Sequence, residues 1–64
     1  MSYGYHMKAA EFYKHAAKHH EEASMHYRNG NQEQGAYHAQ TARQYEEQAR
    51  NSLSEGQKRA YGLR

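Results

Sequence analysis

No residue interrupts helix formation over two long stretches of this chain. The 64 residues include no proline and five glycines, which leave Tyr5 to Asn29 and Ala36 to Glu55 free of both helix breakers. Both stretches are rich in Ala, Glu, Gln, Lys and Arg, which lose least on entering a helix, and Thr41 is the only β-branched residue. The sequence therefore predicts two α-helices and makes strands very improbable.

A turn is predicted at Asn29-Gly30-Asn31, between these stretches. Gly30 can adopt the left-handed conformation that ends a helix, and Asn31 can cap the next one. Because Gly35 follows so soon, the second helix can begin anywhere from Asn31 to Gly35. We expect one domain over residues 1–64, with a first helix over about 5–29, a turn over 29–34, a second helix over about 35–55 that ends at Gly56, and a C-terminal tail over 56–64.

Alanine recurs along both predicted helices at the spacing of a helix–helix interface. Steps of four and three residues mark a seven-residue seam. Small seam residues let antiparallel helices approach closely, while tyrosines at the edges keep their hydroxyls in water. The fold class is therefore all-α, an antiparallel two-helix hairpin. The predicted core or interface residues are Ala9, Tyr13, Ala16, His20, Ala23 and Tyr27 on the first helix, and Ala39, Ala42, Tyr45, Ala49 and Leu53 on the second.

Such a hairpin has few large apolar side chains for a core of its own. Burying one contributes roughly 1.5–3 kcal/mol, against about 1.5 kcal/mol of entropy lost per ordered residue. The absence of cysteine excludes disulfides and thiolate metal sites. Reinforcement is left to a metal ion or to self-association, and we predict a homodimer that forms a four-helix bundle.

Charge and hydropathy exclude two classes of partner. The net charge is +2, and Lys and Arg are interspersed with acidic residues rather than clustered as on a nucleic-acid-binding face. No stretch approaches the roughly 20 apolar residues that span a bilayer, and the N-terminus lacks the features of a signal peptide. We expect no nucleic-acid or membrane partner and a cytoplasmic location.

Histidine is the one chemical signal in the sequence, with six residues in the chain. On the first helix, steps of four, three and four residues return to one face. Neutral imidazoles at i and i+4 can bind one Zn²⁺, Cu²⁺ or Ni²⁺ ion, and a carboxylate can add a third ligand. A turn centred near Asn31 places His38 opposite His26. The predicted metal ligands are His15, His19, Glu22, His26 and His38, with copper or zinc preferred over nickel.

Other interpretations of these residues stay open. The histidine strip is equally the polar flank of an amphipathic helix that carries no ligand. His20 lies in the alanine seam, and we expect a buried core histidine there, paired with Glu46 across the hairpin. The seven tyrosines fit bundle core better than a protein-binding surface. A second class of function is an adaptor that binds another protein through its alanine and tyrosine faces or through the tail Ala60 to Arg64.

The sequence contains none of the catalytic motifs that a helical protein of this kind could carry. No glutamate is followed three residues later by histidine, which is the pattern of carboxylate-bridged di-iron bundles. A His-Glu-x-x-His motif and a glycine-rich phosphate loop are also missing. We therefore predict that the protein is not an enzyme.

The sequence reads AAKHHEEA over residues 16–23 and YHAQTA over residues 37–42, with Asn29-Gly30-Asn31 between them. These runs resemble the small histidine-rich bacterial metal-binding proteins, and the likeness covers roughly Ala9 to Ala49. In that family, helical His-Ala-x-x-Ala repeats separated by glycine-containing turns form a compact bundle that takes up copper and other divalent ions. The resemblance implies metal binding or buffering, and the positions that match the histidine-bearing repeats are His15, His19, His26 and His38.

Overall fold

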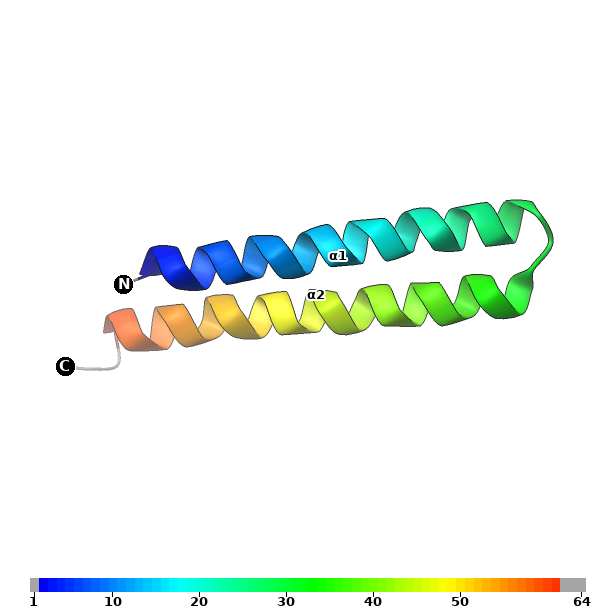
Figure 1. Ribbon diagram of the computed structural model, residues 1–64. Helices are drawn as coiled ribbons and strands as arrows, with labels where there is room; N and C mark the ends of the chain where they lie inside the picture. Colours follow the sequence, from blue (N-terminus) through cyan, green and yellow to red (C-terminus); the bar gives the residue numbers. More distant parts are fainter. Residues whose placement is uncertain (1, 62–64) are drawn as a thin grey trace.

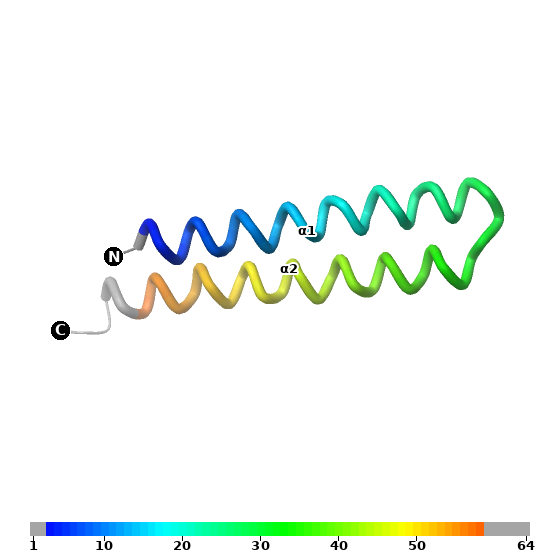
Figure 2. Tube along the Cα trace, in the orientation of Figure 1, coloured from blue at the N-terminus to red at the C-terminus, as the bar shows by residue number. Residues whose placement is uncertain are grey.

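The computed structural model describes residues 2–61, and it consists of two helices that lie side by side (Figure 1). Helix α1 is Ser2–Arg28 and helix α2 is Gln32–Tyr61. Figure 2 shows the two helices running in opposite directions, joined by a short turn at one end of the molecule. The predicted all-α hairpin is confirmed.

Backbone hydrogen bonds in the turn end α1. Gly30 has a φ of 83°, and its amide donates to the carbonyl of Tyr27 at 3.1 Å. The amide of Asn31 donates to the carbonyl of His26 at 2.7 Å. Together these bonds form the Schellman motif, in which a left-handed glycine ends a helix. Gly30 is therefore the residue that turns the chain back on itself.

Helix α2 begins at Gln32, within the range from Asn31 to Gly35 that the sequence allows for its start, and it ends later than the sequence predicts. The carbonyl of Asn31 accepts a hydrogen bond from the amide of Gly35 at 2.9 Å, so the helical pattern starts directly after Asn31. At its other end, α2 continues through Gly56 to Tyr61. The tail predicted over 56–64 is thus helical as far as Tyr61, and residues 62–64 lie outside the described residues.

A line of small residues separates the two helices. On each helix these residues recur every seven positions, so one small side chain in two turns lies between the backbones. Among the residues whose burial is described, no large side chain is fully buried. The core of the hairpin is therefore narrow. Its buried residues are Ala9, Ala16 and Ala23 on α1, and Gly35, Ala42, Ala49 and Gly56 on α2.

Two glycines lie inside α2 because tyrosines of α1 pack against them. A Cβ atom on Gly35 would lie 2.8 Å from Cδ1 of Tyr27, and one on Gly56 would lie 2.8 Å from Cβ of Tyr5. Both distances are shorter than ordinary carbon–carbon contacts, which are about 3.5–4.0 Å. The glycines therefore permit close approach of the helices, and neither of them ends α2.

The structure corrects the prediction that His20 lies in the core, because its side chain is 51% exposed. Tyr13 and Tyr27, which share its seam, are 42% and 49% exposed. The alanines already bring the two backbones together, so a larger side chain on this seam is displaced to the edge of the interface. The predicted seam residues of intermediate burial are Ala39, Tyr45 and Leu53.

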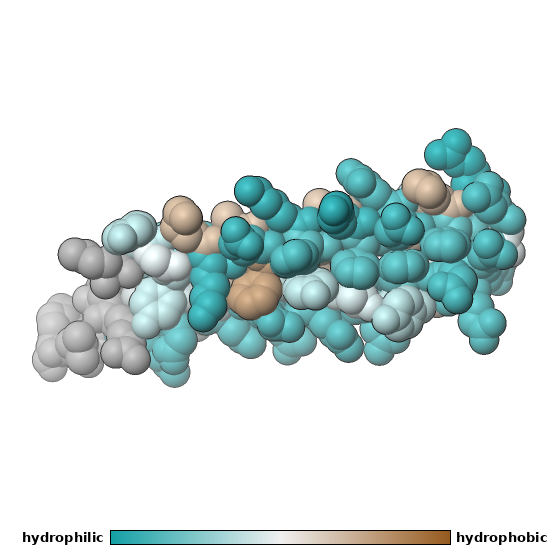
Figure 3. All heavy atoms as spheres, viewed as in Figure 1, coloured by the Kyte–Doolittle hydropathy of each residue, from teal (hydrophilic) through white to brown (hydrophobic). Residues whose placement is uncertain are grey.

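The hairpin is long and thin, with Cα extents of 53 × 14 × 9 Å. Figure 3 shows hydrophilic residues over most of the visible face and apolar residues in separate spots. Within residues 2–61, neither helix has an apolar stretch long enough to cross a membrane. The molecule therefore presents a mainly polar rod on this face.

Replacing Gly56 by alanine is expected to destabilise the hairpin by about 1–3 kcal/mol, because the new Cβ meets the Cβ of Tyr5, which cannot move without its backbone. The matched control is Gly4→Ala, also in a helix, where nothing lies within 4 Å of the added atom. That change is expected to be neutral or to stabilise by up to about 1 kcal/mol. Urea unfolding of both variants measures the difference, and equal stabilities would contradict the close contact at Gly56.

Candidate metal centre

One side of the hairpin carries a row of aromatic rings contributed by both helices. The ring of Tyr45 stacks on His15 and His19 at centroid distances of 5.0 and 5.6 Å. The ring of His38 stacks on His19 at 5.2 Å and on His26 at 5.3 Å. These distances are typical of favourable aromatic pairs. We call this set the aromatic row, and its members are Phe12, His15, His19 and His26 of α1 with His38 and Tyr45 of α2.

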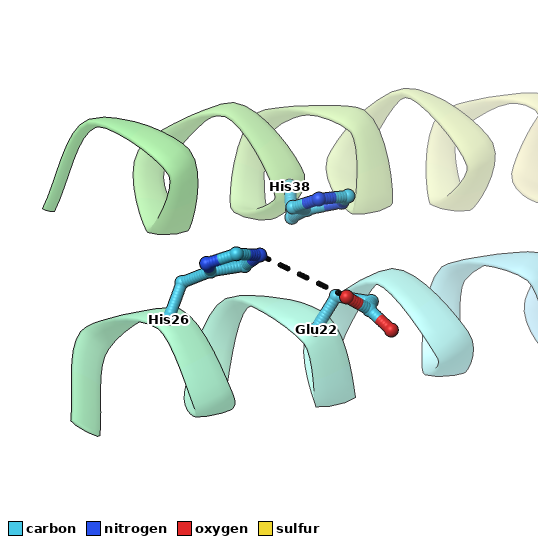
Figure 4. A group of neighbouring side chains, drawn as sticks. All are labelled: Glu22, His26 and His38. Carbon is cyan, nitrogen blue, oxygen red and sulfur yellow. Dashed lines mark ion pairs between the residues drawn. The ribbon is translucent and has the colours of Figure 1, made fainter. Parts of the chain in front are cut away.

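At the end of the aromatic row nearest the turn, Glu22, His26 and His38 form a cluster that can hold a metal ion. Each residue offers one ligand atom, and these atoms all lie within 4.8 Å of one another. Nε2 of His26 is 3.8 Å from Oε1 of Glu22, one helical turn away. Figure 4 shows Glu22 and His26 on α1, with His38 facing them from α2. The cluster therefore joins the two helices.

The cluster lies at the edge of the interface between the helices rather than in the alanine core. The side chain of His26 is 28% exposed and that of Glu22 is 50% exposed, while His38 is half-buried. The imidazole rings of His26 and His38 are nearly parallel, with 5° between their planes. An ion can thus reach the ligand atoms from solvent, and each histidine is held in place by its neighbour.

His19 touches this cluster through His38. The Nδ1 atoms of the two histidines lie 3.0 Å apart, so one imidazole donates its proton and the other accepts it. His19 itself does not belong to the group of convergent ligand atoms. His19 is also half-buried, and its ring stacks on the ring of Tyr45.

The structure brings together three of the five predicted ligands, Glu22, His26 and His38. His15 lies against Tyr45 instead. A helix rises 1.5 Å per residue, so His15 and His26 are about 16 Å apart along α1. One ion therefore cannot bind both His15 and His26. The spacing of residues along α1 does not by itself show which of these two histidines receives a further ligand from α2.

The opposite side of the hairpin has its own link between the helices. Nε2 of His20 lies 2.9 Å from Oε2 of Glu46, the residue with which the sequence pairs it. Both side chains retain solvent access, at 51% and 32% exposure. Such an exposed pair contributes little to stability, about 0–1 kcal/mol.

The sequence pattern predicted no role for Phe12 in the aromatic row. Phe12 is half-buried, and its ring centroid is 6.3 Å from that of Tyr45. The spacing in the sequence could have indicated this position. Phe12 precedes His15 and His19 by three and seven residues and so lies on the same strip of the helix.

The fold and the cluster define a small helical hairpin with a candidate metal site between its helices. In comparisons with family models, with curated proteins and with solved structures, the chain has no match. The function is therefore argued from the chemistry of the cluster.

Proposed function

We propose that this protein binds a divalent transition-metal ion, Cu²⁺ or Zn²⁺, and serves in metal binding or buffering. The observation that carries the proposal is the convergence of ligand atoms from Glu22, His26 and His38 within 4.8 Å. Two imidazoles and one carboxylate suit zinc and copper, whereas Mg²⁺ and Ca²⁺ prefer ligand sets made of oxygen. The resemblance of the sequence to histidine-rich bacterial metal-binding proteins points the same way.

The number of ligands favours exchange of the ion over permanent storage. Three protein ligands leave a coordination position for water or for an exchanging ligand, whereas structural zinc sites are closed by four. Glu22 is half exposed, so a competing ligand can approach the ion from solvent. A site of this kind can take up and release metal, which is what buffering requires.

We further propose that two hairpins pair into a four-helix bundle. The chain has an accessible surface of 5198 Å², whereas a compact monomer of 7.5 kDa exposes about 4,200 Å². The excess of about 1,000 Å² is close to the roughly 800 Å² that each partner buries in a standard interface. The large apolar side chains available for this contact are Tyr3, Met7, Tyr13, Met25, Tyr27 and Tyr37.

Native mass spectrometry of the untagged protein with stoichiometric Zn²⁺ tests both proposals. The wild-type protein is expected as a dimer that retains at least one ion per chain. The double variant His26→Ala/His38→Ala keeps only Glu22 of the cluster and is expected to lose the ion, with affinity reduced by more than about 100-fold, since loss of an outer-shell partner alone costs 10- to 100-fold. Its helicity by circular dichroism should persist, because both residues lie outside the alanine core.

The matched control is His6→Ala, which removes one exposed histidine of α1 outside the cluster and is expected to bind zinc like the wild type. Undiminished binding by the double variant would contradict the proposed site. A folded monomer at all concentrations would contradict the dimer. A folded dimer that binds no zinc would instead favour the adaptor function, in which the exposed tyrosines bind another protein.

A further inference from the structure

The geometry points to His19 as a positioning residue that holds His38 in the form that binds metal, rather than as a ligand. This inference rests on the proposed metal site. It starts from the 3.0 Å separation between Nδ1 of His19 and Nδ1 of His38. This is the side-chain hydrogen bond that ties a member of the cluster to a residue outside it.

The ligand atoms that converge with His26 do not include one from His19. The two residues are seven positions apart on α1, which corresponds to about 10 Å along the helix. Nitrogen ligands lie about 2.0–2.1 Å from zinc, so two nitrogens on one ion are at most about 4 Å apart. The ring of His38 lies between them in the aromatic row, at 5.2 Å from His19 and 5.3 Å from His26. His19 therefore has a task other than coordination.

The tautomer of His38, that is, which ring nitrogen carries the proton, defines that task. A neutral imidazole carries one proton on two nitrogens, and only the unprotonated nitrogen can bind an ion. Because Nδ1 of His38 is engaged with His19, the ion has to bind at Nε2, and the proton of His38 has to stay on Nδ1. His19 then accepts that proton in a hydrogen bond at its own Nδ1. Partners of this kind fix the tautomer and the ring orientation of a metal-binding histidine.

The packing of His19 suits this role. Its ring is half-buried and stacks on Tyr45 with 17° between the ring planes. Tyr45 also stacks on His15 and contacts Phe12. The accepting nitrogen is therefore held by rings of both helices before any ion arrives, so His38 does not have to be reoriented on binding.

Two substitutions separate positioning from coordination. His19→Ala removes the acceptor and is expected to weaken zinc binding by about 10- to 100-fold. In His19→Asn, the amide oxygen can stand near the place of Nδ1 and accept the same proton, so affinity is expected to return to within a few-fold of the wild type. Equal losses in both variants would show that His19 is a ligand, and an unchanged affinity in His19→Ala would exclude any role for it at the site.

Nitrogen-15 NMR of the histidine-labelled wild-type protein tests the proton directly, with and without Zn²⁺. We expect the proton on Nδ1 of His38 in both samples, with a coupling across the hydrogen bond to Nδ1 of His19. A proton on Nε2 of His38 in the zinc-bound protein, or the absence of the coupling from both samples, would overturn the inference. The metal-free sample still tests the hydrogen bond if zinc does not bind, so failure of the metal site and failure of the positioning role are distinguishable.

Discussion

Replacing Ala42 by leucine is expected to lower the melting temperature of the hairpin by about 4–24 °C. Ala42 is 0% exposed, and the added carbon atoms have to be placed between two backbones that a line of small residues holds together. Overpacking of this kind costs about 1–3 kcal/mol. A folded unit of this length is stable by only about 3–9 kcal/mol, so the loss is a large part of the total. Each kcal/mol corresponds to about 4–8 °C in a domain of this size.

Thermal unfolding followed by circular dichroism measures this effect. The matched control is Ala17→Leu, which introduces the same side chain at an exposed position of α1, where substitutions usually change stability by less than about 0.5 kcal/mol. If the Ala42→Leu and Ala17→Leu proteins have the same melting temperature, the helices do not approach closely at Ala42, and this position is not part of a tightly packed core.

The helices were predictable because the chain lacks any competing signal. Without proline and with a single β-branched residue, local preference and the alanine spacing agree. Gly56 was wrongly predicted to end the second helix, since glycine usually marks a helix boundary. Both Gly35 and Gly56 lie inside α2, where an added Cβ would collide with a tyrosine of the other helix, and that contact is visible only once the helices are placed together.

The seven-residue period of the seam was predictable, but which of its side chains are buried was not. A spacing of four and three residues includes both Ala16 and His20, and it does not distinguish the centre of an interface from its edge. The size of the side chains makes the distinction. Alanine at every seventh position brings the backbones so close that His20 and Tyr13 are left at the surface.

The candidate site was predictable as a region. The spacing of Glu22 and His26 on one helix, with a turn near Asn31, places His38 opposite them, and the structure brings these three together. The separate place of His19 depends on the orientation of two imidazole rings. The rotation of these side chains is set by packing between the two helices, and a spacing rule along one helix contains no information about it.

Zinc at a hundred times its dissociation constant is expected to raise the melting temperature of the wild-type protein by about 10–20 °C. In the proposed site the ion binds Glu22 and His26 on α1 and His38 on α2, and the unfolded chain does not hold these ligands together. A ligand that binds only the folded state adds about 2.7 kcal/mol at this concentration. At about 4–8 °C per kcal/mol, this gives the expected shift.

Melting curves at one fixed protein concentration, with and without Zn²⁺, measure this shift, and a chelator should reverse it. His38→Ala removes the proposed ligand from α2, so the ion would no longer connect the helices and most of the shift should disappear. Ca²⁺ at the same concentration should leave the melting temperature unchanged, because it prefers oxygen ligands. An equal zinc shift in the wild type and in His38→Ala would mean that the ion binds elsewhere, since the stabilisation depends on a ligand set that spans both helices.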